Sequence, residues 1–181
     1  MRPSTARRPT DPARSDDPRQ VTTDPDPDRS VLELRSELLD LAISLAEEAG
    51  RVTLGYFGEV LDPEMKGDGT PVTVADRDAE ALLRERILAA HPSHGILGEE
   101  FGETNPGASV RWILDPIDGT KSFVHGVPFY GVLIGVEIHG KPNVGVAHFP
   151  ALAETVAAAR ELGCRWKRAG SKHAHPPGQK A

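Results

Sequence analysis

The apolar residues of this chain change their spacing part-way along it, and this change constrains the fold more than any other feature. Over residues 31–56 and 73–90, apolar side chains recur every three or four positions, the period of an amphipathic helix. Beyond residue 94 the pattern changes to short apolar runs bounded by turn residues, which is typical of β-strands. These runs cover residues 95–97, 110–114, 129–138, 143–149 and 154–159. We therefore expect an α/β layered fold, with two N-terminal helices followed by a largely antiparallel sheet.

The ends of these elements carry residues with known structural preferences. Ser30 is predicted to be the N-cap of the first helix, which ends near residues 55–58. Thr73 begins the second helix, and the pair His91-Pro92 stops it. The segment HGKPN at residues 139–143 is typical of a hairpin loop, so the two strands that it joins are predicted to be antiparallel.

Composition divides the chain into three parts. Residues 1–30 contain six Pro, six Arg and six Asp and almost no apolar side chains. Such a segment cannot bury enough surface to offset the entropy lost on ordering, so it is predicted to be a disordered tail. Residues 31–165 are predicted to form one domain. Residues 166–181 lose all periodicity and are predicted to be an irregular tail.

Charge and cysteine content argue against several classes of protein. The formal net charge of −6 disfavours a nucleic-acid-binding protein, which would carry a clustered basic surface. No apolar run approaches the roughly 18 residues that cross a bilayer, and the N-terminus has no apolar signal segment. The single cysteine, Cys164, cannot form an internal disulfide. We expect a cytoplasmic protein whose partner is a small molecule, not nucleic acid or a membrane.

Acidic residues stand at the ends of several predicted elements. Asp76 lies at the start of the second helix, and Glu99 and Glu100 follow the first predicted strand. Asp115 and Asp118 follow the second strand, in the segment WILDPIDGTKSFVHG. Carboxylates that converge without basic partners repel one another unless a cation lies among them, and hard oxygen ligands select Mg²⁺ or Mn²⁺.

The turn after Asp115 also has the features of an anion site. Pro116 stiffens the turn, and Gly119 allows the backbone to approach a ligand closely. If a helix begins at Gly119-Thr120, its free N–H groups can bind an anion. Cations beside an anion site indicate phosphate ester chemistry.

Each of these residues also has a purely structural interpretation, which the local sequence leaves open. Asp76 stands three residues after Thr73, the spacing of a capping box. The pair Glu99-Glu100 fits a solvated loop. Asp115 precedes Pro116 and Asp118 precedes Gly119, and both Asp-Pro and Asp-Gly are common turn dipeptides. Thr120 fits the first turn of a helix.

Two other acidic motifs fail on spacing. An EF-hand loop needs acids at its first, third and fifth positions before the glycine, where this chain has Leu114, Pro116 and Asp118. A haloacid-dehalogenase-type phosphatase uses an aspartate nucleophile in a DxDGT pattern. Here the nucleophile position would be Pro116, which cannot serve.

Three ordered motifs carry a resemblance to a known family. They are GDGTPVTVAD at residues 67–76, GILGEEFG at 95–102 and WILDPIDGTKSFVHGVPFYGVLIGVE at 112–137. Over residues 33–165 the chain resembles the inositol monophosphatase family of metal-dependent, lithium-sensitive phosphatases, and within it the histidinol-phosphatases of histidine biosynthesis. The resemblance implies a layered, sugar-phosphatase-like fold. It also implies hydrolysis of a small phosphorylated metabolite by a metal-activated water, without a protein nucleophile.

The resemblance further implies a set of metal ligands. Glu99, Asp115 and the backbone carbonyl of Ile117 would hold a first Mg²⁺, or Mn²⁺ in its place. Asp115 would bridge to a second ion, which Asp118 would also hold.

The same resemblance assigns the phosphate and the attacking water. The backbone amides of Gly119 and Thr120 would bind the phosphate. Asp76 would accept a hydrogen bond from the Thr120 hydroxyl, which helps to orient the water. Glu99, Thr120 and Asp76 are thus the implied catalytic residues.

The chain also departs from the family pattern. Members of the family continue for roughly another hundred residues, which supply a further aspartate to the second metal, whereas this chain has no Asp after Asp118. We therefore expect a chain truncated at its C-terminal half, with apolar strand surface left exposed and a homodimer as one result. The alternatives to a histidinol-phosphate phosphatase are an inositol-1-monophosphatase and a truncated remnant without activity.

Overall fold

The computed structural model describes residues 27–59, 63–65, 67 and 71–168, which form three helices, nine strands and one 3₁₀ turn. In chain order the elements are α1 (Pro27–Tyr56), β1 (Glu64–Met65), β2 (Pro71–Val72), α2 (Val74–Ala90), β3 (Gly95–Gly98), β4 (Gly102–Thr104), β5 (Val110–Asp118), α3 (Thr120–Val124), β6 (Gly131–Ile138), β7 (Lys141–Phe149), η1 (Pro150–Leu152), β8 (Glu154–Ala159) and β9 (Gly163–Lys167). The expected order of two helices followed by strands is confirmed.

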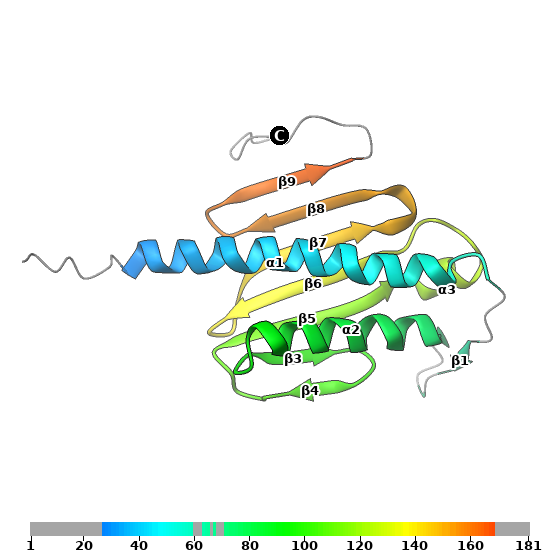
Figure 1. Ribbon diagram of the computed structural model, residues 1–181, viewed down its shortest axis with the longest axis horizontal. Coiled ribbons are helices and arrows are strands. Elements are labelled where there is room, and N and C mark those ends of the chain that lie inside the picture. Colours follow the sequence, from blue (N-terminus) through cyan, green and yellow to red (C-terminus); the bar gives the residue numbers. More distant parts are fainter. Residues whose placement is uncertain (1–26, 60–62, 66, 68–70, 169–181) are drawn as a thin grey trace, which may run out of the picture.

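Seven strands form one sheet in the order β4-β3-β5-β6-β7-β8-β9 (Figure 1). Its pairs are antiparallel, including the predicted β6–β7 hairpin, except that β3 and β5 run parallel. The expectation of a largely antiparallel sheet is therefore confirmed. Since β3 and β5 are parallel neighbours, their carboxyl ends meet at the same edge of the sheet.

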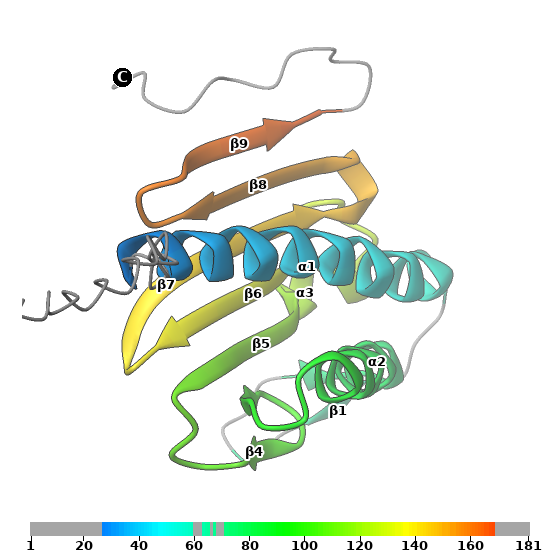
Figure 2. The same ribbon diagram turned by 60° about the vertical axis from the view of Figure 1, so that its left-hand side comes forward.

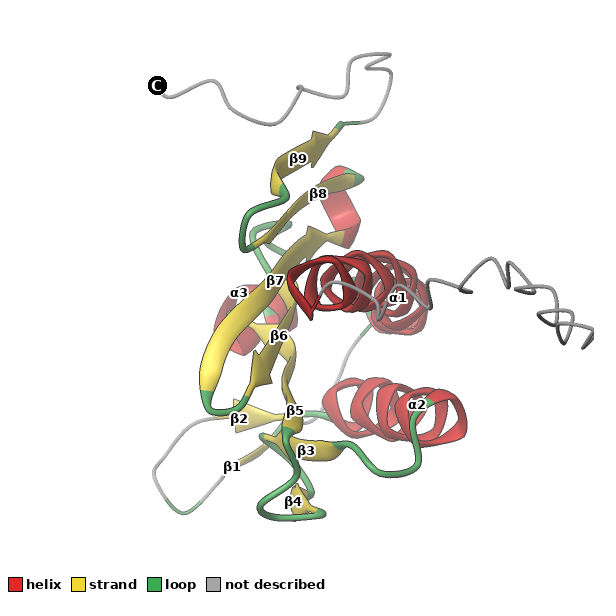
Figure 3. Cartoon of the chain, turned by 90° about the vertical axis from the view of Figure 1, so that its left-hand side faces the viewer, coloured by secondary structure: helices red, strands yellow, loops and turns green. Residues whose placement is uncertain are grey.

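The two long helices pack on the same face of this sheet. Helix α1 lies over β6, β7 and β8, and α2 lies over β5 (Figures 1 and 2). Seen along the strands, both helices stand on one side (Figure 3). Strand residues alternate between the faces, so alternate residues in the middle of β5, β6 and β7 point toward the helices and are buried.

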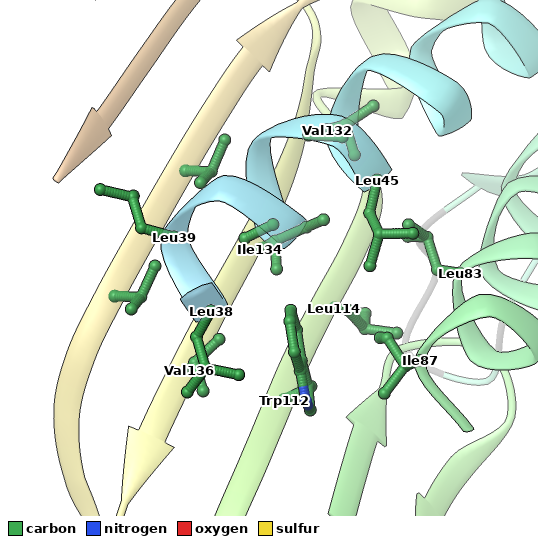
Figure 4. Packing of buried hydrophobic residues seen from close by; sticks show 14 of the residues in the cluster. Leu38, Leu39, Leu45, Leu83, Ile87, Trp112, Leu114, Val132, Ile134 and Val136 are labelled. Carbon is green, nitrogen blue, oxygen red and sulfur yellow. The ribbon is translucent and has the colours of Figure 1, made fainter. Parts of the chain in front are cut away.

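The main core fills the space between this face and the helices. Leu38 and Leu45 come from α1, Leu83 and Ile87 from α2, and Trp112 from β5 (Figure 4). All five side chains are at most 1% exposed. Each such burial contributes roughly 1.5–3 kcal/mol, so this layer holds the helices on the sheet.

The structure moves several predicted boundaries. Helix α1 begins at Pro27, so Ser30 lies within it and is not its N-cap. Proline fits the first turn of a helix because the N–H it lacks would have no intrahelical partner there. The predicted end of α1 is confirmed at Tyr56, and α2 has Thr73 as N-cap and His91 as C-cap, as predicted.

Strands were missed or cut short where their apolar signal is weak. Strand β4 and the small β1–β2 pair have few apolar residues. Strand β5 continues to Asp118, four residues beyond its predicted end. Strand β9 extends to Lys167, so the predicted irregular tail does not begin at 166. The disordered tail predicted for residues 1–30 is wrong at its end, because residues 27–30 belong to α1. Residues 1–26 and the residues from 169 lie outside the described residues.

Candidate metal centre

The parallel pairing of β3 and β5 brings two of the predicted acids together. Gly98 at the end of β3 is in register with Leu114 of β5. The next residues on the two segments are Glu99 and Asp115, and a hydrogen bond joins their side chains. Two residues that are far apart in the sequence are thus neighbours because their strands end at the same edge.

A bulge at the end of β5 brings Asp118 to the same place. Asp115 pairs with Leu133 of β6 and Asp118 pairs with Gly131, so three steps on β5 face two steps on β6. Residues three apart on a regular strand point to opposite faces, but one extra residue reverses this relation. Pro116 suits the bulge, since it has no N–H to contribute to the sheet.

The chain then turns sharply into α3, as the sequence predicts. Gly119 is the N-cap of α3 and has a φ of 88°, in the left-handed region that glycine adopts without strain. A side chain there would also bring its Cβ within 3.2 Å of the Phe129 carbonyl oxygen. The Thr120 hydroxyl donates a hydrogen bond to the Ile117 carbonyl (3.1 Å) and closes the turn.

These segments surround one open cavity of about 240 Å³. Its lining consists of Glu99, Asp115, Ile117, Asp118, Gly119, Thr120 and Lys121. Six of the seven residues predicted for the site are therefore in the lining, and Asp76 is not. Lys121 was not predicted.

The electrostatics of the cavity are dominated by crowded carboxylates. Burial, the negative charges of Glu99 and Asp118 and the hydrogen bond with Glu99 together raise the pKa of Asp115 to about 7, and burial is the largest of these causes. Among the buried side-chain nitrogen and oxygen atoms of the described residues, Asp115 Oδ1 is the one without a hydrogen-bond partner. An unpartnered buried oxygen between two further carboxylates fits a hard divalent cation.

The carboxylates of Glu99, Asp115 and Asp118 would have to move closer together to coordinate such an ion. In the part of the chain that the structure describes, no three Asp, Glu, His or Cys side chains form a finished set of metal ligands. Ile117 also lines the cavity, so its backbone carbonyl would add a fourth oxygen-bearing group to the three carboxylates.

Asp76 has the structural role that the capping-box interpretation predicts. Its Oδ2 accepts hydrogen bonds from the backbone N–H of Thr73 (2.8 Å) and from the Thr73 hydroxyl (2.6 Å). The Thr120 hydroxyl donates a hydrogen bond to the Ile117 carbonyl. The start of α2 is nevertheless close to the site, since Ala75 packs in a cluster with Ile117 and Phe123.

A buried glutamate that sequence reasoning missed supports the loop that carries Glu99. Glu80 of α2 is 0% exposed and accepts hydrogen bonds from the backbone N–H groups of Glu100 (2.7 Å) and Phe101 (3.1 Å). Gly98 makes room for it, because a Cβ at Gly98 would lie 1.9 Å from Glu80 Oε1. Glu80 therefore positions the turn in which Glu99 stands.

Arg84 completes this support one helical turn later. Its Nε donates to Glu80 Oε1 (2.8 Å), and its other nitrogens donate to the Thr104 hydroxyl (2.9 Å) and the Gly102 carbonyl. The signal in the sequence was a Glu and an Arg four residues apart, with the Glu on the apolar stripe of α2 next to Ala79 and Leu83. An acid on that stripe must be paired to be buried.

Comparison with known proteins identifies the class to which this arrangement belongs. Residues 34–179 match the sequence profile of the inositol monophosphatase family, and the chain belongs to this family. The resemblance found in the sequence is thus confirmed, and the match continues past residue 165, where sequence reasoning placed its end. Members of this family are metal-dependent phosphatases.

Two relatives show which phosphatases of the family the chain resembles. The chain is 54% identical over 126 residues to a histidinol-phosphatase of Chlorobaculum parvum, covering 69% of this chain and 49% of that protein. It is 39% identical over 130 residues to an inositol-1-monophosphatase of Rhizobium meliloti, covering 70% and 48%. It therefore spans about half the length of the curated relatives that it matches.

A solved structure agrees with the fold. A Thermotoga maritima inositol monophosphatase superposes with a TM-score of 0.68 at 33% identity, over 72% of this chain and 51% of that one. The layered fold expected from the sequence is confirmed by this likeness. Among the described residues, no helix combines the length and apolarity needed to cross a bilayer.

Proposed function

We propose that this chain is a Mg²⁺-dependent phosphomonoester hydrolase, or the part of one that holds its first metal ion. The observation that carries the proposal is the unpartnered, buried Oδ1 of Asp115 in a cavity that Glu99 and Asp118 also line. Family membership supports the reaction class. Mn²⁺ has the same preference for oxygen ligands and would serve in place of Mg²⁺.

The proposed metal ligands are the oxygen atoms at the base of the cavity. Glu99, Asp115 and the Ile117 carbonyl would hold the first ion, and Asp118 would hold a second together with Asp115. When bound, the ions would supply Lewis acidity toward the phosphate and lower the pKa of a nearby water. The support for this assignment is their shared place in the cavity lining.

The residues at the start of α3 are proposed to hold the phosphate. The Gly119 and Thr120 amides lie at the helix start, where N–H groups lack intrahelical partners. Thr120, Glu99 and Asp76 are proposed to orient the attacking water. This requires the Thr120 hydroxyl to turn from the Ile117 carbonyl toward Asp76, which stands next to Ala75 in the same part of the molecule.

Histidinol phosphate is the proposed substrate, because the chain is 54% identical to a histidinol-phosphatase and 39% identical to an inositol-1-monophosphatase. Inositol-1-phosphate is the alternative, supported by the second group of relatives. The proposed partner is thus a small phosphorylated metabolite, not nucleic acid or a membrane. A cytoplasmic location is proposed from the lone Cys164, which is free and exposed.

Phosphate release tests this proposal directly. The chain and an Asp115→Asn variant would be incubated with histidinol phosphate and with inositol-1-phosphate, with and without Mg²⁺. The proposal predicts release that needs Mg²⁺ and is lost in the variant, and the faster substrate identifies the specificity. A folded chain that releases no phosphate under any condition would reject catalysis by this chain and favour the inactive remnant.

A further inference from the structure

One lysine lines the candidate metal centre and has no part in the proposed set of metal ligands. Lys121 is the second residue of α3 and lines the same cavity as Glu99, Asp115 and Asp118. Among the described residues that line this cavity, it is the one basic side chain. A positive charge beside three carboxylates affects every charged ligand that enters the cavity.

The ammonium group of Lys121 is not engaged by an acid of the protein. The ion pairs formed among the described residues do not include it, although three carboxylates line the same cavity. Its side chain is exposed. The charge of Lys121 is therefore available to a ligand of the cavity.

The backbone of Lys121 is anchored, in contrast to its exposed side chain. A hydrogen bond joins its carbonyl oxygen to His125 Nδ1 (2.7 Å). Two residues further on, Phe123 is 2% exposed and packs edge-on against Tyr130, with ring centroids 4.8 Å apart. The start of the lysine side chain is thus fixed beside the cavity, while its flexible four-carbon stem lets the ammonium adjust to a ligand.

A count of charges shows what the cavity lacks once its proposed ligands are bound. Glu99, Asp115 and Asp118 carry three negative charges, and two divalent cations would add four positive charges. A phosphate monoester adds about two negative charges near neutral pH. One negative charge then remains, and the ammonium of Lys121 compensates it. If a single divalent cation is bound, the excess of negative charge is larger and the lysine matters more.

The other protein groups proposed to hold the phosphate carry no net charge. The backbone amides of Gly119 and Thr120 are neutral donors, and a hydrogen bond from an ionised donor is roughly twice as strong. Lysine is a common phosphate ligand in proteins, where it acts as a point charge. In the lining of this cavity, Lys121 is the residue that can supply such a bond.

We propose that the ammonium of Lys121 binds the phosphate group of the substrate. Lys121 is then a substrate-binding residue that compensates the second negative charge of a phosphomonoester, and it is not a metal ligand. This inference rests on the proposed function, since it requires the metal ions and the phosphate to occupy this cavity.

Two binding measurements on Lys121→Gln test the proposal. Binding of Mn²⁺ is measured by electron paramagnetic resonance, and binding of inorganic phosphate to the Mn²⁺-loaded protein by the ³¹P relaxation that the bound ion causes. The variant should bind Mn²⁺ at least as tightly as the wild type, because it lacks a cation that repels the ion. It should bind phosphate about fivefold more weakly or worse, because a charge-assisted hydrogen bond is lost.

Two further variants control for charge and for position. Lys121→Arg keeps the positive charge and should bind phosphate as the wild type does. Lys141→Gln removes the same charge from an exposed position at the far end of β6 and β7, where Ile138 pairs with both Val110 and Lys141. It should change neither affinity.

The outcomes separate this inference from the proposed function. A wild type that binds Mn²⁺ and phosphate, with equal phosphate affinity in Lys121→Gln, would overturn the role of Lys121 alone. Weaker binding of both Mn²⁺ and phosphate by Lys121→Gln would indicate a damaged site and would also overturn it. A wild type that binds no phosphate would overturn the inference, and one that binds no Mn²⁺ either would reject the proposed function with it.

Discussion

Asp115 combines burial with repulsion, and this combination makes its charge costly when no metal is bound. Its raised pKa has burial as its largest cause, followed by the charges of Glu99 and Asp118. A residue that is kept under such conditions is typical of a binding site whose ligand compensates the charge.

The Asp115→Asn variant is expected to be more stable than the wild type at pH 8 in the presence of a chelator. The amide removes a charge from the cluster at nearly constant size, so the free energy of unfolding should rise by about 1 kcal/mol. At pH 5 the gain should shrink, because Asp115 with a pKa of about 7 is already protonated there. Urea unfolding measures both values. A loss of stability at pH 8 would contradict this explanation, and the exposed Asp40→Asn is the control.

The stability of the core depends on pH through one hydrogen bond to His94. Trp112 Nε1–H donates to His94 Nδ1 (3.1 Å), so this nitrogen must be unprotonated. Burial lowers the pKa of His94, and the charge of His91, stacked at 4.3 Å, lowers it further, while Glu37 of α1 opposes both. The folded protein therefore binds a proton at His94 less readily than the unfolded chain does.

The stability that His94 contributes is complete above its unfolded-state pKa of about 6.5 and is lost as the pH falls through the lower folded-state value. In the Asp115→Asn background, which removes the opposite titration of Asp115, we expect the free energy of unfolding to decrease between pH 7.5 and pH 5, and to decrease less when His94→Asn is added. Replacement of the exposed His139 by Asn is the control and should leave the pH dependence unchanged. An identical decrease in all three proteins would contradict the role of His94.

At the scale of elements, the attachment of α2 to the β3–β4 loop depends on one buried ion pair. Glu80→Gln would leave the guanidinium of Arg84 without its charged partner, and breaking such a pair costs about 3–5 kcal/mol. Glu85→Gln on the exposed side of the same helix should change stability by less than about 0.5 kcal/mol. Thermal unfolding of both variants measures the difference. Equal effects would show that Glu80 is not a specific support of the loop.

Helix α1 contains two glycines that should respond oppositely to the same substitution. A Cβ at Gly50 would lie 2.6 Å from the ring of His148 on β7, whereas one at Gly55 would meet nothing within 4 Å. Gly50→Ala is therefore expected to destabilise by about 1–3 kcal/mol. Gly55→Ala should stabilise by about 0.5–1 kcal/mol through helix propensity. Chemical unfolding of the two variants decides the point, and a stable Gly50→Ala would contradict the close packing of α1 on β7.

At the scale of the whole molecule, the sequence predicted the parts that have a strong local signal. The periodic helices and the hairpin between β6 and β7 were found, and the acids at the strand ends do line one cavity. The long-range features were missed. The parallel pairing of β3 with β5 and the bulge that turns Asp118 toward Asp115 depend on neighbouring strands. Glu80 was missed because its partners are backbone groups distant in the sequence.

The exposure of one sheet face is also a property of the whole molecule. Apolar and polar side chains alternate along each strand, which predicts one buried and one exposed face of the sheet. Which face is buried follows only from the packing of α1 and α2. The candidate metal centre lies at one end of this sheet, where Asp115 of β5 pairs with Leu133 of β6. The sheet therefore carries the candidate metal centre at one end, next to the face opposite α1 and α2.

Binding of Mn²⁺ measured by electron paramagnetic resonance tests the central claim most directly, since it requires neither substrate nor turnover. Free Mn²⁺ gives a sharp signal that decreases when the ion binds, and Mg²⁺ should compete for the same site. The claim predicts saturable binding to the wild type and to Glu85→Gln, with a loss of at least tenfold in affinity for Asp115→Asn. Absence of binding, or equal binding by Asp115→Asn, would contradict a metal centre formed by Glu99, Asp115 and Asp118.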